Sequence, residues 1–243
     1  MKKTLGFFLL NFKIITAEKI AFVWSVLLPA FIAIVHQQNV LRSLSGFREW
    51  VLYLCWFWVF IIISCFVYGV GLQLARLRES GMLKTYTMLS GGKYPIVFGT
   101  ILSQIVFCLV SLFIFTFIIT FLNGMMGARF FILPVILLFI SLPFGLFILF
   151  LPNLPFQYGN FSVIVNILIY LLLWLAYDSG NGSLAALFNP FRLFYELALF
   201  IGGLLRIHEP FAFRPEYAIV LGIYLLIGFF SLKKLNLLSV VQR

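Results

Sequence analysis

The sequence predicts an all-α polytopic membrane protein. Hydrophobic residues make up 63% of its 243 residues and charged residues only 10%, whereas soluble domains are about a quarter charged. The apolar residues form continuous runs, several of them long enough to cross a bilayer as helices. Strands of a membrane barrel would alternate apolar and polar residues instead. We therefore expect a single transmembrane domain, residues 1–243, with six transmembrane helices.

Residues 1–19 begin like a secretory signal peptide, with a lysine pair followed by apolar residues. Lys13, Glu18 and Lys19 interrupt the apolar run, and no small-residue cleavage site precedes them. Lys2 and Lys13 lie eleven residues apart, about three helical turns, so they share one face of a helix. This segment predicts an N-terminal helix that lies in the membrane interface.

Six apolar segments follow and are the expected membrane spans. They are Ile20–Val35, Trp50–Leu74, Ile96–Leu122, Phe130–Leu151, Phe161–Tyr177 and Tyr217–Leu232. The third is long enough to tilt in the bilayer, and Pro134 and Pro143 are the expected kink points of the fourth.

Residues 178–216, between the fifth and sixth spans, are more polar than a span and more apolar than a free loop. Asn189 followed by Pro190 is a helix-entry signal. Arg192 and Glu196 are then spaced as neighbours one helical turn apart. We expect an extracytoplasmic segment of short helices that dip into, or rest on, the outer leaflet.

Lysine and arginine residues concentrate on the cytoplasmic side of membrane proteins, and this bias orients the chain. With the N-terminus inside, the cytoplasmic segments hold eleven of the 17 Lys and Arg residues but only two of the 7 acids. All eight lysines are among the eleven. The sequence therefore predicts a multi-pass protein of the cell (cytoplasmic) membrane, with both termini and the loop of residues 76–94 in the cytoplasm.

Residues that would carry catalysis or bind a metal do not form a recognisable group. The cysteines Cys55, Cys65 and Cys108 fall inside apolar runs without metal-ligand or disulfide spacing. The stretch SGGKY at residues 90–94 lacks the preceding glycine and the following Ser or Thr of a phosphate-binding loop. The net charge of +10 comes without an aromatic-basic cluster for nucleic acid. We expect no catalytic residue, metal site or cofactor in this chain, and no nucleic-acid partner.

The six expected spans contain no Asp, Glu, Lys, Arg or His. Transporters driven by protons or ions usually bury such groups near mid-membrane, because coupling needs a group that titrates or coordinates the ion. If this protein moves a substrate uphill, we expect the energy to enter from elsewhere.

The loop of residues 76–94 carries a short charged motif. It reads Arg78, Glu79, Ser80, Gly81, Met82, Leu83 and Lys84, close to the pattern R-E-x-G-T-[LM]-[EK] with Met82 in place of threonine. The motif and the layout of the whole chain resemble the permease subunits of type-2 ATP-binding-cassette exporters. That family has an interfacial N-terminal helix, six spans, a charged cytoplasmic loop after the second span, and membrane-dipping helices before the last.

The resemblance implies a transport subunit that has no ATP-binding motif of its own. Its partners would be two ATP-binding-cassette ATPase subunits, which bind ATP and Mg, and a second copy of the chain or a homologue. The ATPase-coupling interface would consist of Arg78, Glu79, Gly81, Met82, Leu83 and Lys84. Gly81 and Gly91-Gly92 would bound a short helix there. Exposed Leu83, Met82, Tyr86 and Met88 would fill a groove while Arg78, Glu79 and Lys84 set the register. Arg76 and Lys93 would mainly fix orientation.

In that family the second and fifth spans of two protomers face each other along the translocation path. The resemblance places Phe57, Phe60, Ser64, Asn166 and Tyr170 on this path. Asn166 is a lone strongly polar residue within a span, and such residues more often bond across a helix interface than contact substrate. A path without charges implies an amphipathic or hydrophobic cargo, such as a peptide, a lipid-like molecule or a drug.

Two other functions stay open from the sequence. A membrane-embedded sensor or immunity protein would bind a toxic peptide without transporting it, and would have no ATPase partner. A lipid-modifying enzyme would need polar catalytic residues at one membrane interface, and the sequence offers no convincing set.

Overall fold

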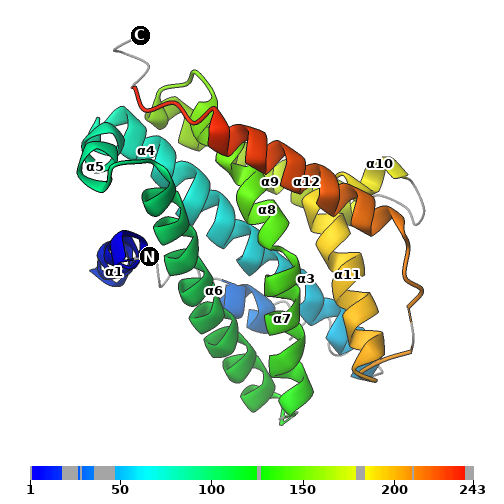
Figure 1. The fold of residues 1–243 in the computed structure, drawn as a ribbon. Helices are drawn as coiled ribbons and strands as arrows, with labels where there is room; N and C mark the ends of the chain where they lie inside the picture. The colour runs from blue at the N-terminus through cyan, green and yellow to red at the C-terminus, as the bar shows by residue number, and fades with distance from the viewer. Residues whose placement is uncertain are drawn as a thin grey trace.

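The computed structural model describes residues 2–17, 27, 29–35, 47–124, 127–178, 184–209 and 211–238. Every regular element in these ranges is a helix (Figure 1), which confirms the all-α class for the described part of the chain. The expected first span, Ile20–Val35, lies mostly outside the described residues, although residues 29–35 are helical.

Four described helices are long and apolar enough to cross a membrane, or five units if one bent pair counts as a span. The first is a continuous helix made of α3 (Phe47–Phe66), a π-helical segment η1 (Val67–Leu72) and α4 (Gln73–Glu79). The others are α6 (Tyr94–Leu122), α9 (Tyr158–Asp178) and α12 (Glu216–Lys233). The bent pair joins α7 (Ala128–Ile140) to α8 (Leu142–Phe147) and the 3-10 segment η2 (Ile148–Asn153). These units occupy the positions of the second to sixth expected spans.

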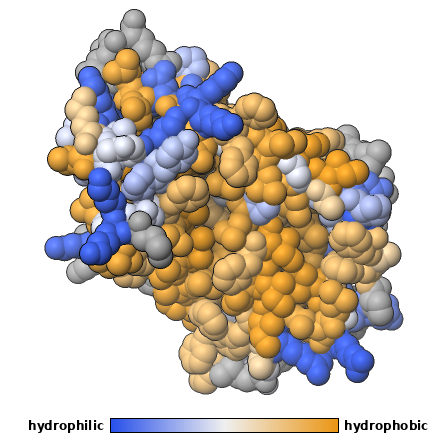
Figure 2. Space-filling view, in the orientation of Figure 1, coloured by the Kyte–Doolittle hydropathy of each residue, from blue (hydrophilic) through white to orange (hydrophobic). Residues whose placement is uncertain are grey.

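The surface in Figure 2 has two hydrophilic groups at opposite corners of the view, with a broad apolar area between them. One group lies over α1 and α5, near the C-terminus. We call this end the α5 side; it also holds loop residues 154–157 and the segment 234–238 (Figure 1). An apolar belt between polar ends is typical of a protein that spans a membrane.

The central helix of the bundle is α3, which packs against α6 and α11. In the span that contains α3, 67% of the most apolar stretch is buried inside the protein, whereas the corresponding share for α9 is 22%. Trp58 of α3 is fully buried and donates its indole Nε1–H to Thr116 Oγ1 of α6 at 2.9 Å. This bond ties the central helix to its neighbour.

Replacing Thr116 by valine is expected to lower the free energy of unfolding by about 1–3 kcal/mol, because the buried indole N–H of Trp58 loses its acceptor. Ser111→Ala is the matched control, since the buried Ser111 hydroxyl donates to the Phe107 carbonyl of its own helix and its loss leaves no donor stranded. Thermal unfolding in detergent micelles measures both. Equal losses would contradict the cross-helix role of Thr116.

The bend between α7 and α8 measures 41°. Ser141 ends α7, and Pro143 stands in the first turn of α8, where its missing N–H costs no helical hydrogen bond. The expected kink point at Pro143 therefore coincides with the bend. At Pro134, by contrast, α7 continues as a helix.

Close packing of α12 on α8 depends on Gly228. A Cβ at this position would lie 2.7 Å from the carbonyl carbon of Leu146 and 2.9 Å from its oxygen. Small residues allow such close backbone approach between membrane helices. Six residues earlier on α12, a Cβ at Gly222 would have no neighbour within 4 Å.

The N-terminal helix α1 (Lys2–Ala17) crosses α6 on the outside of the bundle (Figure 1). Asn11 Nδ2 donates to Thr100 Oγ1 of α6 at 3.0 Å, and both residues are buried. A Cβ on Gly99 would lie 2.7 Å from Phe7 Cβ, so the two helices touch at this glycine. Lys2 and Lys13 are exposed.

Two helices, α10 (Leu184–Leu187) and α11 (Pro190–Leu204), occupy the segment between the last two spans. Asn189 starts α11, because its side chain accepts the Phe191 N–H at 3.0 Å, as the helix-entry signal predicted. Most of α11 is buried, and it packs against α3, α7 and α9. It is therefore an inner helix of the bundle and does not lie on its surface.

The start of α11 lies beside the interior of two longer helices and not beside their ends. Asn189 Nδ2 donates to the Leu172 carbonyl of α9 at 2.7 Å, and Tyr224 Oη of α12 donates to the Phe188 carbonyl at 3.1 Å. Leu172 lies six residues before the end of α9, and Tyr224 eight residues after the start of α12. At 1.5 Å per residue these positions are about 9–12 Å from the helix ends.

Candidate functional site

The charged motif ends α4 and begins α5 (Met82–Ser90), a separate short helix between two left-handed glycines. Gly81 precedes α5 with φ 74°, and Gly91 ends it with φ 72°. Glycine adopts this conformation without the steric cost that a Cβ brings. The predicted short helix between these two glycines is therefore present.

The outer face of α5 is apolar with one cation. Met88 and Leu89 are 70% and 74% exposed, and Met82 and Lys84 are exposed as well. Leu83 is fully buried, so the expectation that it would fill a partner's groove is wrong. Its side chain lies on the inner face of α5 and belongs to the hydrophobic core.

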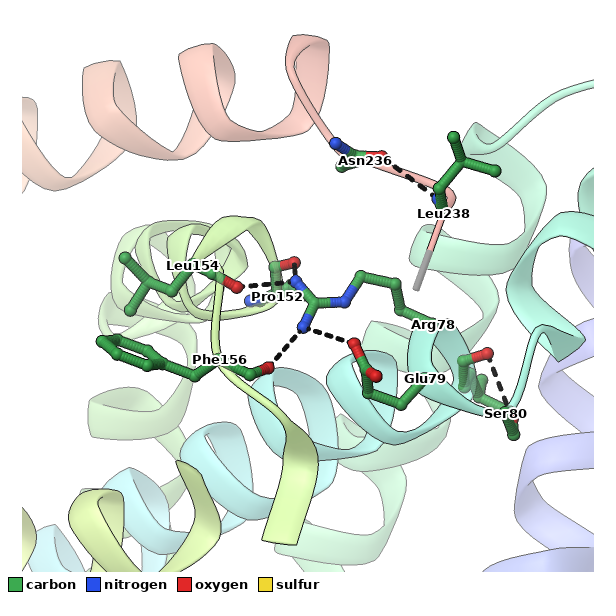
Figure 3. Close-up of polar contacts among 9 residues, drawn as sticks. Arg78, Glu79, Ser80, Pro152, Leu154, Phe156, Asn236 and Leu238 are labelled. Carbon is green, nitrogen blue, oxygen red and sulfur yellow. Dashed lines mark hydrogen bonds and ion pairs between the residues drawn. The ribbon is translucent and has the colours of Figure 1, made fainter. Parts of the chain in front are cut away.

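Arg78 was expected at the contact surface, but it points into the molecule and is only 1% exposed. Its Nη1 donates to the carbonyl oxygens of Pro152 at 2.6 Å and Leu154 at 2.7 Å (Figure 3). Its Nη2 donates to the Phe156 carbonyl at 2.8 Å and to Glu79 Oε1 at 2.9 Å. We call Arg78 and the three carbonyl groups the Arg78 clasp.

The clasp offsets much of the cost of burying the Arg78 guanidinium: four of its five N–H groups are bonded, and Nε has no hydrogen-bond partner in the described part of the chain. A buried guanidinium is stable only when its donors are bonded and its charge is balanced. The carbonyl of Pro152 lies in the last turn of η2, at the negative end of that helix, and the carbonyls of Leu154 and Phe156 belong to the loop that follows it. Charge-assisted bonds to such oxygens are short and strong. The half-buried Glu79 supplies the balancing charge, so it supports Arg78 and is not simply an exposed contact residue.

Helix α9 runs antiparallel to α3 and η1, and two contacts fix their register. Tyr68 Oη donates to Asn166 Oδ1 at 2.6 Å. Further along, the rings of Trp56 and Tyr177 lie 6.2 Å apart. Asn166 therefore has the cross-helix bonding that the sequence favoured for a lone asparagine within a span.

Four of the five residues expected on a translocation path lie along this pair of helices. Phe60 and Ser64 fall at four-residue intervals between the two contacts, so they share one face of α3, and Tyr170 lies one turn beyond Asn166 on α9. Ser64 Oγ is buried with no hydrogen-bond partner in the described part of the chain. We call Phe60, Ser64, Asn166 and Tyr170, with Tyr68, the α3–α9 stripe. Phe57 points elsewhere, stacking on Phe115 of α6 with ring centroids 5.7 Å apart.

A buried ionic cluster between α11 and α12 was not assigned from the sequence. Arg192 Nε donates to Glu196 Oε1 at 2.7 Å, and Tyr217 Oη donates to Glu196 Oε2 at 2.8 Å. Arg214 Nη1 lies 3.7 Å from the same Oε2. The sequence spacing correctly predicted that Arg192 and Glu196 pair on one helix. The sequence signal for the burial of this pair is Tyr217, a tyrosine at the start of the last span.

No protein-family model matches this chain, and neither a curated protein nor a solved structure matches it. Among the described residues, no three His, Cys, Asp or Glu side chains are grouped to hold a metal ion. The described geometry offers two contact surfaces, the outer face of α5 on the α5 side and the α3–α9 stripe within the apolar belt.

Proposed function

We propose that this chain is the permease subunit of an ATP-driven exporter in the cell membrane. The observation that carries the proposal is α5, a short helix between two left-handed glycines that presents exposed methionine, leucine and lysine side chains. Exposed apolar side chains beside a charge suit docking on a soluble protein, because apolar anchors supply affinity and charges set register. The partners are two ATP-binding-cassette subunits, which supply ATP and Mg, with α5 facing the cytoplasm.

The α3–α9 stripe is the proposed place for cargo. It combines aromatic rings with hydroxyl and amide groups and contains no charged residue, which suits an amphipathic or hydrophobic molecule. Much of α9 is uncovered, with Ile167, Tyr170 and Trp174 exposed. A second copy of the chain, or a homologue, placed against α9 would enclose the stripe between two subunits.

Exposed residues of α5 test the proposal better than Glu79, because Glu79 also supports Arg78 inside the fold. Met88→Glu places a charge in the middle of the proposed contact, whereas Gln157→Glu adds the same charge at an exposed position of the α5 side. The tagged chain is purified from its native membrane, and the proteins that accompany it are identified by mass spectrometry. We expect a subunit with an intact ATP-binding cassette to accompany the wild type and Gln157→Glu, and its recovery to fall about tenfold or more with Met88→Glu.

A wild-type chain purified under gentle conditions without any such ATPase would contradict the proposal. Equal recovery with both variants would remove α5 as the docking element. In the first case, the alternative of a membrane-embedded sensor or immunity protein would be favoured, because that function needs no ATPase.

A further inference from the structure

Two cations flank α5, and each one bonds a carbonyl group at the end of another helix. Arg78, before α5, holds the end of η2 through the clasp. Lys93, after α5, donates from Nζ to the carbonyl of Lys233, the last residue of α12, at 2.6 Å. Burial lowers the pKa of the Lys93 amine below its usual value. Both cations thus interact with the negative end of a helix, the arrangement that stabilises helix C-termini.

The ends of η2 and α12 are also bonded to each other. Asn153 Nδ2 donates to the Ser231 carbonyl at 3.0 Å, and its Oδ1 accepts the Asn236 N–H at 3.1 Å. Hydrogen bonds therefore connect α4, the loop after η2, and the end of α12, and Lys93 closes the ring at the start of α6. This ring surrounds the point where α5 leaves and rejoins the bundle.

The ring acts on α5 through α4, because α5 packs against α4 and its fully buried Leu83 belongs to the hydrophobic core. Gly81, in the left-handed region, turns the chain from α4 into α5, and Gly91 leads toward α6. The bonds of the Arg78 side chain, which is only 1% exposed, are short and reach a loop 74 to 78 residues away in sequence. They connect α4 to the residues that lead directly into α9, which begins at Tyr158.

We propose that Arg78 is a positioning residue that couples α5 to α9, so that a displacement of α5 moves the helix that carries Asn166 and Tyr170. This inference rests on the proposed function for its biological meaning, but the coupling itself is a property of this chain. Arg78 acts through the carbonyl groups of the loop and touches neither the ATPase nor the cargo. Coupling through a contiguous set of bonds requires that the two elements move as one body.

The first test measures that rigidity in the chain alone. Spin labels are attached at Lys84→Cys on α5 and Gln157→Cys before α9, both exposed positions; the native cysteines are buried. Pulsed electron paramagnetic resonance in lipid nanodiscs gives the distance distribution. We expect one narrow distribution for the otherwise unchanged chain and a broader one for Arg78→Lys, because an ammonium cannot bridge several acceptors as the planar guanidinium does.

Arg76→Lys is the control, because it makes the same change at an exposed position of α4, and its distance distribution should stay narrow. A narrow distribution for Arg78→Lys would overturn the proposal.

The second test leaves Arg78 intact and loosens the connection to α9. Two glycines are inserted between Phe156 and Gln157, in the exposed loop before α9, where insertions are tolerated. In cells, we expect ATPase recovery to match the wild type while ATP-dependent extrusion of the amphipathic dye rhodamine 6G falls about tenfold or more. Full extrusion by the insertion variant would overturn the coupling, even if Arg78→Lys fails to accumulate. If no ATPase partner accompanies the wild type, the proposed function is contradicted. The distance measurement then still tests whether Arg78 holds α5 and the start of α9 rigidly together.

Discussion

Replacing Glu196 by leucine should cost about 3–5 kcal/mol of folding free energy, the largest effect we expect from a single substitution outside the clasp. The Glu196 carboxylate is 4% exposed and accepts bonds from both Arg192 and Tyr217. Without it, the buried guanidinium of Arg192 loses the carboxylate that it bonds, and Tyr217 of α12 loses its hydrogen-bond acceptor on α11. Thermal unfolding in detergent micelles, together with the amount of folded protein in the membrane, measures the loss.

Two variants separate charge from bulk in this cluster. Glu196→Gln keeps one acceptor oxygen, replaces the other by an NH2 group and removes the charge, so it should cost less than the leucine variant, which removes both acceptors. Glu209→Leu removes an exposed carboxylate and should change stability by less than about 0.5 kcal/mol. A leucine variant at position 196 as stable as the wild type would mean that packing alone holds α11 in place.

Alanine at Gly228 and at Gly222 should change stability in opposite directions. At Gly228 the added methyl group would meet the backbone of Leu146, which cannot move aside as a flexible side chain can, so we expect a loss of about 1–3 kcal/mol. At Gly222 the added group has open space, and alanine should stabilise the helix by about 0.5–1 kcal/mol.

The two alanine variants serve as each other's control, because both lie on α12 and change the same number of atoms. Both variants are unfolded by increasing concentrations of a denaturing detergent. Circular dichroism follows the unfolding and gives the difference in stability between them. If Gly228→Ala unfolds at the same point as Gly222→Ala, α12 and α8 are not held at the close approach described.

Sequence patterns predicted the elements whose signals are local. The apolar runs gave the positions of the long helices, because roughly twenty apolar residues suffice to identify such a helix. Gly81 and Gly91 predicted the limits of α5, since backbone conformation at those points depends on the glycines themselves. Asn189 predicted the start of α11 for the same reason.

The direction in which Arg78 and Leu83 point could not be predicted in the same way. The partners of Arg78 are backbone carbonyls 74 or more residues away, and backbone groups leave no mark in the sequence. The motif was interpreted as a surface, whereas the fold turns two of its residues inward and leaves Met82 and Lys84 outward. One side of a short helix packs on the bundle and the other side is exposed. The sequence of α5 alone does not determine which residues lie on each side.

The burial of the charged pair on α11 could not be predicted for a different reason. The spacing of Arg192 and Glu196 predicted that they are neighbours on one helix, but their burial depends on Tyr217 of another helix, which completes the hydrogen bonding. A polar residue count treats each charge separately, whereas burial depends on the pair. The absence of ionisable residues from the spans thus coexists with a buried ion pair in the helix between them.

The cations at helix ends have a practical consequence for topology mapping. Lys93, Arg78 and also Lys3, whose Nζ donates to the Ser90 carbonyl at 2.9 Å, are among the residues expected from the sequence to orient the chain, yet each also bonds a backbone carbonyl. Neutralising one of them would alter the insertion signal and the folded structure together, so an inverted or degraded product would have two explanations. The exposed Lys234 carries the same charge at the same side of the molecule and lies outside the proposed contact face of α5, and reporter fusions built on its substitution would register orientation alone.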